Sequence, residues 1–250
     1  TGIRMAEVVN LNETPTPDPI WARSVDNFHH AAPADLPAPF RDAFVLAAPV
    51  IDTTIYLDYL LRRARAHGGQ VIQRAVGDLA DAFAGHAVVV NCTGLGAREL
   101  VGDRDIYPSR GQVLRVKPNG FQRVVMADDD PREMAYVVPR IHDVVLGGTD
   151  DERNESTEPD PAVTAGILER CARICPAFAH VAPEDILSVV CGLRPVRSEV
   201  RVEAERVGPE RVLIHNYGHG GAGITLSWGC AADVVGLVAA AGAQPHPPGH

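Results

Sequence analysis

The chain has 250 residues, of which 46% are apolar, and its formal net charge is −9 at pH 7. This length allows one sizeable hydrophobic core or two modest ones. The acidic balance argues against nucleic acid or an anionic membrane as the main partner. The sequence has no uninterrupted apolar run of about 18 residues, so no membrane span is expected.

The cysteines indicate the compartment in which the protein works. Five of them, an odd number, stand at positions 92, 171, 175, 191 and 230 without a paired framework. This favours reduced thiols in a cytoplasmic protein. The spacing of Cys171 and Cys175 could suit a metal, but no second His or Cys pair matches it, so no metal site is expected. No signal-peptide pattern follows Thr1, and the first methionine is Met5.

Proline and helix signals organise the first third of the chain. Residues 1–49 predict strands and loops around a proline-rich stretch, residues 15–39. Residues 52–69 predict the clearest helix, which Asp52 or Thr53 can cap and the glycine pair at 68 and 69 ends. Residues 70–76 predict a strand.

The stretch HAVVVNCTG, residues 86–94, predicts a fully buried strand of a parallel sheet. A glycine-containing loop follows at its carboxyl end, where ligands of open α/β sheets bind.

The next part of the chain switches to short strands. Residues 105–150 predict an antiparallel sheet with Pro, Asn and Asp turns. A helix is predicted over residues 160–176, between Pro161 and Pro176, and a bent strand over residues 188–207. Because α/β pieces flank this β-rich middle, we expect the chain to leave one domain and return to it.

A glycine-rich turn separates a strand at 211–216 from an apolar helix. Four glycines fall within six positions, Gly218, Gly220, Gly221 and Gly223. Glycine sacrifices backbone entropy, so this density indicates positive φ angles or a ligand against bare backbone. A helix that is apolar all round is expected to be buried, with the partial positive charge of its amino end facing the turn. Such an end favours a phosphate or a flat ring that becomes anionic on reduction; a tight turn without a ligand is the alternative.

Other catalytic patterns are weak. His215 and His219 are four residues apart, as in a metal pair, but the glycine between them breaks the helix that would align them. No Ser-His-Asp, Cys-His or paired-carboxylate constellation is present, so no acid–base residue is predicted.

Four motifs occur in the order VVNCTG, RGQVLRV, GLRPVR and HNYGHGGAGITLSWGCA. Together they resemble the D-amino-acid oxidase family of flavoenzymes, which includes D-aspartate oxidases, and the resemblance covers essentially the whole chain. It departs at one point. The family's strand–GxGxxG–helix unit, which binds the ADP part of FAD, has no counterpart in this sequence.

The fold implied by the resemblance is α/β. Residues 51–104 and 196–250 would form an incomplete FAD-binding Rossmann-like domain that lacks its N-terminal dinucleotide unit. Residues 1–50 and 105–195 would form a β-rich substrate-binding domain with flanking helices.

The resemblance implies FAD as the cofactor. In the family, the glycine turn and the following helix end face the pyrimidine side of the isoalloxazine ring. The matching residues are Gly220, Gly221, Ala222, Gly223, Ile224 and Thr225. Thr93 and Val76 match positions that approach FAD in relatives.

The resemblance also implies a substrate site. Arg194 matches the arginine that holds the substrate carboxylate, and Tyr136 matches the tyrosine whose hydroxyl joins it. The carbonyl of Gly221 would meet the substrate amine. Read without the resemblance, Arg194 could form a structural ion pair and Tyr136 could pack in a core. Arg197 is expected to be a structural partner of nearby acids.

The family's active-site lid is altered in this sequence. A second family tyrosine, on the lid loop of the mammalian enzymes, has no counterpart, and Pro131 or Arg132 falls at its place. Acidic D-substrates would require further cations in the pocket, for which Arg132 and Arg140 are the candidates.

The implied reaction is the oxidation of D-amino acids by hydride transfer from Cα to flavin N5, which yields 2-oxo acids, ammonia and hydrogen peroxide. The expected partners are a D-amino acid and oxygen, without nucleic acid or membrane, and a homodimer is left open. Two alternatives remain: a glycine or sarcosine oxidase, and a non-catalytic remnant unable to hold FAD. The missing dinucleotide motif favours the second.

Overall fold

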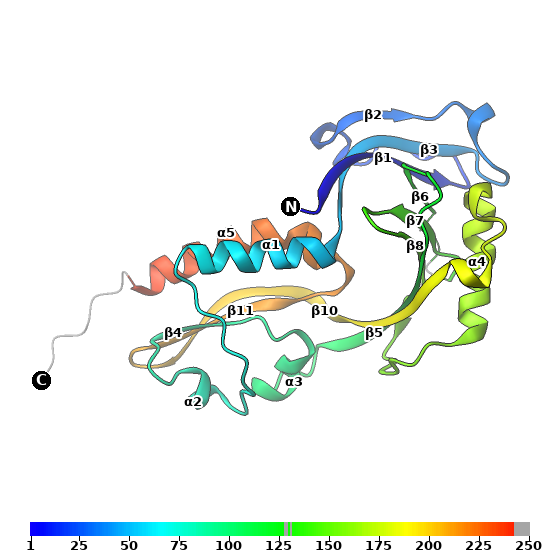
Figure 1. Ribbon diagram of the computed structural model, residues 1–250. Coiled ribbons are helices and arrows are strands. Elements are labelled where there is room, and N and C mark those ends of the chain that lie inside the picture. The colour runs from blue at the N-terminus through cyan, green and yellow to red at the C-terminus, as the bar shows by residue number, and fades with distance from the viewer. Residues whose placement is uncertain (128–129, 131, 243–250) are drawn as a thin grey trace, which may run out of the picture. The chain divides into compact units, whose positions relative to one another are not determined.

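The computed structural model describes residues 1–127, 130 and 132–242 (Figure 1). It has the mixed α/β composition that the sequence predicts, with strands in sheets and helices beside them. The chain divides into two compact units. Unit 1 comprises residues 1–72, 111–150 and 156–192, and unit 2 comprises residues 73–110, 151–155 and 193–250. The chain thus leaves unit 1 and returns to it; the assignment of substrate-binding and FAD-binding domains stays a prediction.

Unit 1 contains a mainly antiparallel sheet. Its strands follow the order β2 (Asp26–His30), β3 (Asp42–Ile51), β1 (Ile3–Asn12), β6 (Val124–Ala127), β7 (Ala135–Pro139), β8 (Val144–Gly147) and the second half of β5 (Tyr107–Val116). Only β1 and β6 pair in parallel among these described strands. The short strands predicted over residues 105–150 are therefore confirmed.

Helix α4 (Pro161–Ile174) covers one face of this sheet (Figure 1). The Asp160 carboxylate caps its first turn by accepting from Ala162 N at 2.7 Å, and proline fits the next position because it lacks an N–H. Residues 167, 171 and 174 form its buried stripe. They pack against alternate residues of the strands, among them Leu114, Val125, Val137 and Leu146.

Helix α1 (Thr53–Ala66) also belongs to unit 1. The sequence leaves two candidates for its cap, and the structure selects Asp52, whose carboxylate accepts from Thr54 N at 3.2 Å and from Thr54 Oγ1 at 2.6 Å. The helix ends where Gly68 adopts a φ of +84°, as the glycine pair predicts. Short 3-10 turns of this unit are Ala22–Ser24, Pro33–Asp35, Pro176–Phe178 and Pro183–Asp185.

Unit 2 is built around β11 (Arg211–His219). This strand pairs antiparallel with the second half of β10 (Ile186–Gly208) and parallel with β4 (Val88–Asn91). The short strand β9 (Asp151–Glu152) pairs with the start of β5. The helices of the unit are α2 (Leu79–Ala82), α3 (Ala97–Leu100) and α5 (Gly223–Gly242), with 3-10 turns at Gly94–Gly96 and Gly220–Ala222.

Two strand predictions need correction. Residues 70–76 form no strand: they pair with no other segment of the described chain, and Val71, Ile72 and Val76 are exposed. An apolar segment becomes a strand only when a partner accepts its backbone hydrogen bonds. Strand β4 is parallel to β11 as predicted, but it is not fully buried, because it lies at the end of the strand order and leaves Val90 38% exposed.

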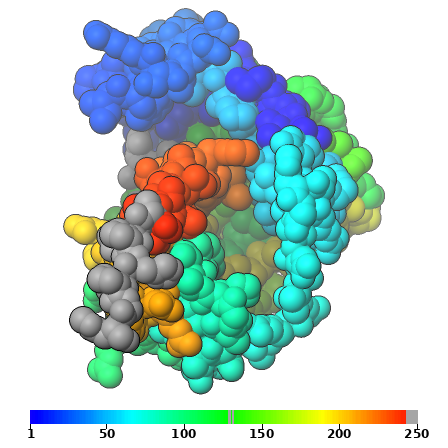
Figure 2. Space-filling view, turned by 90° about the vertical axis from the view of Figure 1, so that its left-hand side faces the viewer, coloured from blue at the N-terminus to red at the C-terminus, as the bar shows by residue number. Residues whose placement is uncertain are grey.

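The prediction that the apolar helix after the glycine turn is buried is wrong. No residue of α5 is buried, and Trp228 is 71% exposed. Figure 2, in which α5 is orange to red, shows its side chains at the surface. The physical reason is that α5 packs on β11 and β4, and two strands can cover only one side of a helix.

By length and composition alone, the segment Gly220–Gly242 is apolar enough to cross a membrane. This differs from the expectation drawn from uninterrupted apolar runs. Small residues interrupt the run without adding charge, and Asp233 is the helix's single charged side chain. Such a segment is weak evidence for a span, and no membrane role is assigned to α5.

Candidate active site

The glycine turn of unit 2 connects β11 to the amino end of α5. Gly218 and Gly220 have φ angles of +86° and +55°, a region that L side chains rarely adopt. Gly218 also lies against Arg197: a Cβ added to Gly218 would be 2.8 Å from the Arg197 Cβ atom. Two of the four glycines are therefore required by the turn itself.

The structure brings Arg194 and Gly221 together within unit 2. A Cβ on Gly221 would lie 3.5 Å from Arg194 Cδ and 3.7 Å from Nε. Arg194 is half-buried, whereas Gly221 is exposed. A guanidinium group and a bare stretch of backbone thus share one surface at the start of α5. The turn and the first turn of the helix contain no acidic side chain that would neutralise the positive helix end.

The network beneath the turn confirms the structural role predicted for Arg197. Its Nε atom donates to the buried Asp103 carboxylate at 3.1 Å, and its Nη2 atom lies 3.5 Å from Asp105. The hydroxyl of Tyr217 donates to Asp103 at 2.7 Å and accepts from Arg201 at 2.8 Å. Burial opposes ionisation of Asp103, but the hydrogen bond from Tyr217 and the arginine charge outweigh it, so the pKa of this carboxyl is lowered.

Thr93 lies at the carboxyl end of β4, as predicted. The Asn91 carboxamide oxygen accepts from Thr93 N at 3.1 Å and from Thr93 Oγ1 at 2.7 Å, which fixes the turn. The next residue, Gly94, approaches the segment that follows Arg194: a Cβ on Gly94 would lie 3.6 Å from Pro195. Val76, by contrast, lies in the exposed segment without regular structure.

The ring of Tyr136, in unit 1, packs against two glycines of the β7–β8 hairpin. It stands on β7 directly opposite Gly147 of β8. Any Cβ on Gly147 would collide with the Tyr136 ring, and a Cβ on Gly148 would lie 2.5 Å from the Tyr136 hydroxyl oxygen. The ring therefore rests on two glycines, and the substrate role of Tyr136 stays a prediction. Gly147 and Gly148 were not predicted from the sequence; the signal that could have found them is the glycine pair directly after the apolar strand VVL.

Of the candidates for the lid and for extra cations, Arg132 and Arg140 lie in the described part of the chain. Pro131 lies outside the described residues. Arg132 is strongly exposed and pairs with Asp130 at 3.2 Å. The guanidinium of Arg140 donates to both oxygens of Asp143, at 2.7 and 2.6 Å. Since both arginines are engaged by carboxylates, neither offers an unpaired charge to an acidic substrate.

His215 and His219 do not form a metal pair in the part of the chain that the structure describes. His215 is buried and its Nε2 atom lies 3.1 Å from Glu205. Burial lowers the pKa of His215 and of His219. No group of three His, Cys, Asp or Glu side chains among the described residues is placed to hold a metal ion.

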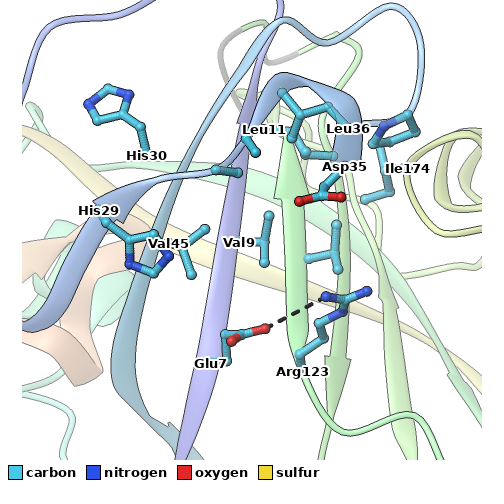
Figure 3. Close-up of a pocket in the computed structure, with 14 residues that line it drawn as sticks. Glu7, Val9, Leu11, His29, His30, Asp35, Leu36, Val45, Arg123 and Ile174 are labelled. Carbon is cyan, nitrogen blue, oxygen red and sulfur yellow. Dashed lines mark ion pairs between the residues drawn. The ribbon is translucent and has the colours of Figure 1, made fainter.

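A cavity of about 290 Å³ lies elsewhere in unit 1, over the β1–β3–β6 region (Figure 3). Val125 and Ile174 line it, so it lies on the sheet face that α4 covers. Val125 is directly opposite Val137, and alternate residues of a strand point to opposite faces. Tyr136 therefore points away from this cavity, which contains no predicted site residue.

Three of the charged or titratable groups that line this cavity have ion-pair partners. Glu7 and Arg123 lie 3.7 Å apart (Figure 3). His30 contacts Asp42 at 2.7 Å and Asp18 at 2.9 Å, and these hydrogen bonds raise its pKa. The candidate site residues therefore lie in two separate places: Arg194 with the glycine turn in unit 2, and Tyr136 with Gly147 and Gly148 in unit 1.

The sequence matches the family of FAD dependent oxidoreductases over residues 12–237, and the chain belongs to that family. The resemblance stated from the motifs is confirmed by two relatives. A D-amino-acid oxidase of Rubrobacter xylanophilus is 43% identical over 242 residues, which are 96% of this chain and 73% of the relative. A D-amino-acid oxidase of Dictyostelium discoideum is 44% identical over 223 residues, which are 88% of this chain and 63% of the relative.

The fold agrees with that of a solved structure. A glycine oxidase from Geobacillus kaustophilus superposes with a TM-score of 0.74 over 96% of this chain and 72% of its own. Its sequence identity of 19% supports the fold alone. FAD is the cofactor of the family.

Proposed function

We propose that this chain supports the FAD-dependent oxidation of D-amino acids to 2-oxo acids, with release of ammonia and hydrogen peroxide. The observation that carries the proposal is the approach of the Arg194 side chain to the bare backbone of Gly221, where only an added Cβ would bring the two into contact, at the amino end of α5. The high identity to two D-amino-acid oxidases supports the same substrate class.

The proposed carboxylate anchor is Arg194. Its planar guanidinium can donate two parallel hydrogen bonds to a carboxylate and stays charged when it is half-buried. Tyr136 is proposed to add its hydroxyl to the carboxylate, and the carbonyl of Gly221 to accept from the substrate amine. These roles require neither a general base nor a metal, because positioning supplies much of the rate.

The residues of the turn fit FAD by their chemistry. Residues 220–225 present backbone N–H groups at a helix end without acidic side chains, and glycine lets a flat ring approach closely. Thr93, at the end of β4, and Val76 are the further proposed contacts. FAD held by these residues would supply a hydride acceptor for the substrate Cα, with oxygen as the final electron acceptor. The N–H groups at the start of α5 would stabilise negative charge that develops on the ring.

The test is the protein that carries this chain, expressed and purified with added FAD. We expect an absorbance band near about 450 nm from bound flavin. We also expect hydrogen peroxide with D-alanine and none with L-alanine. Faster turnover of glycine or sarcosine than of any D-amino acid would favour the amine oxidase instead. Absence of bound flavin under all conditions would favour a non-catalytic remnant.

Adding one methyl group beneath Tyr136 should weaken carboxylate binding. In Gly147→Ala the new Cβ would occupy space filled by the Tyr136 ring, so the ring must move, at a cost of about 1–3 kcal/mol. We expect the Kd of benzoate, a flat carboxylate, to rise about 10- to 100-fold in a flavin absorbance titration. Gly192→Ala is the matched control, since a Cβ there meets nothing within 4 Å. Equal benzoate affinity in Gly147→Ala and the parent would contradict the role of Tyr136.

A further inference from the structure

A side chain of helix α4, Arg170, is hydrogen-bonded to the backbone at the ends of β7 and β8, the hairpin that carries Tyr136. Arg170 donates from Nε to the Met134 carbonyl at 3.0 Å and from Nη2 to the Gly148 carbonyl, also at 3.0 Å. Met134 precedes β7, and Gly148 follows β8. One guanidinium group therefore joins the two chain segments at the end of the β7–β8 hairpin.

This end of the hairpin is weakly held by its own backbone. The bond from Gly148 N to the Met134 carbonyl is 3.4 Å long, beyond the usual range for an N–H···O bond. Arg170 bonds to the carbonyls of the same two residues, and hydrogen bonds from a charged donor are about twice as strong as neutral ones. The charged side chain thus reinforces a hydrogen bond that the backbone makes poorly.

The next residue of α4, Cys171, contacts the adjacent cross-strand pair, Tyr136 and Gly147. The Cys171 thiol is buried and lies 3.5 Å from the Tyr136 carbonyl and 3.4 Å from the Gly147 carbonyl. Burial raises the pKa of this thiol to about 12, so it keeps its proton and can donate. Helix α4 therefore contacts the carbonyls of Tyr136 and of both glycines beneath its ring.

The position of the Tyr136 ring depends on this backbone. The ring lies on the face opposite α4, against Gly147 and Gly148, which have no side chains to absorb a shift. A displacement of either backbone segment must therefore move the ring relative to its support. A misplacement of about 1 Å in a site can lower activity about a hundredfold.

We propose that Arg170 is a positioning residue for substrate binding: it joins the Met134 and Gly148 carbonyls and so fixes the Tyr136 hydroxyl for the substrate carboxylate. This inference rests on the proposed function, in which Tyr136 contacts the carboxylate. Arg170 itself acts from the opposite face of the sheet and does not touch substrate.

The helix offers two further variants that separate positioning from stability. Gly166 stands one turn before Arg170, and a Cβ on it would lie 3.2 Å from Arg170 Nη1. Gly166→Ala should therefore shift the guanidinium by a few tenths of an ångström while improving helix propensity. Arg173, one turn after Arg170, pairs with Glu133 at 2.8 Å on the exposed surface, and Arg173→Met is the matched control because such pairs contribute little.

The experiment measures benzoate Kd, KM and kcat for D-alanine, and the melting temperature of the FAD-loaded protein. In Arg170→Met we expect Kd and KM to rise about tenfold with kcat changed less than about twofold. Arg170→Lys should recover only part of the loss. Its ammonium keeps the positive charge but cannot bridge both carbonyls. Gly166→Ala should raise Kd and KM without lowering the melting temperature. Arg173→Met should leave Kd and KM unchanged.

A double-mutant cycle with Tyr136→Phe separates this inference from the proposed function. If Arg170 acts through the hydroxyl, Arg170→Met should have little further effect on benzoate binding in the Tyr136→Phe background. If Tyr136→Phe weakens benzoate binding and neither Arg170→Met nor Gly166→Ala does, the positioning role is wrong and the proposed function stands. If Tyr136→Phe itself has no effect on benzoate, the proposed function fails at this residue and the positioning role fails with it.

Discussion

Arg194→Leu is expected to lower kcat/KM for D-alanine about 30- to several-thousand-fold in the FAD-loaded protein, while the flavin stays bound. The expectation comes from losing one partner of a desolvated charge pair, which costs about 2–5 kcal/mol, at about 1.4 kcal/mol for each factor of ten. Arg194 lies against Gly221 at the start of α5, so the lost charge would lie beside the proposed flavin and amine contacts. Steady-state kinetics and the flavin spectrum measure both parts.

Two further variants define the role of this arginine. Arg194→Lys should recover only part of the activity, because a single ammonium lacks the two-pronged geometry. Arg197→Leu should reduce stability more than substrate affinity, since Arg197 is committed to Asp103. Parental kcat/KM and parental benzoate affinity in Arg194→Leu would show that the carboxylate anchor lies elsewhere.

Removal of the Asp103 carboxylate is expected to cause the largest loss of stability. Its side chain is 4% exposed and meets Tyr217, Arg197 and Arg201, the last at 3.7 Å. Asp103→Ala removes the one buried carboxylate that these groups share and should cost about 3–5 kcal/mol of unfolding free energy, as for a broken buried pair. Urea unfolding followed by circular dichroism measures the loss.

The control and the pH dependence sharpen this prediction. Asp105→Ala removes a carboxylate that is 68% exposed and 3.5 Å from the same Arg197, and should cost less than about 1 kcal/mol. The pKa of Asp103 is lowered in the fold, so its contribution is present above the unfolded value of about 3.9 and is lost as the pH falls through the folded value. The stabilities of the parent and Asp103→Ala should therefore converge in acid. A constant difference across that range would contradict the network.

The sequence predicts best what local chemistry determines. The helices at 53–66 and 161–174 follow from their caps, Asp52 and Asp160, and from the glycine and proline signals at their ends. The glycine turn follows from the density of glycine, and the structure gives Gly218 and Gly220 the positive φ angles that this residue permits.

The features that sequence reasoning missed depend on distant partners. Residues 70–76 have the composition of a strand but no neighbouring strand in the described chain. Helix α5 is exposed although its residues are apolar. Its own sequence could not show this, because burial requires other segments to cover the helix. The support of Tyr136 by Gly147 arises from the register of two strands, and a single sequence does not display which residues face each other across a hairpin.

The parallel pair β1–β6 has a consequence for the order in which unit 1 folds. It joins Val8 to Val124, whereas the β7–β8 hairpin closes between Pro139 and Val144. Contacts between residues far apart in sequence carry a larger loop-closure entropy and slow the folding of proteins that depend on them. The hairpin that carries Tyr136 can therefore form early from nearby residues. Pairing of β1 with β6, which brings together residues more than a hundred positions apart, is expected to limit the rate at which this unit folds.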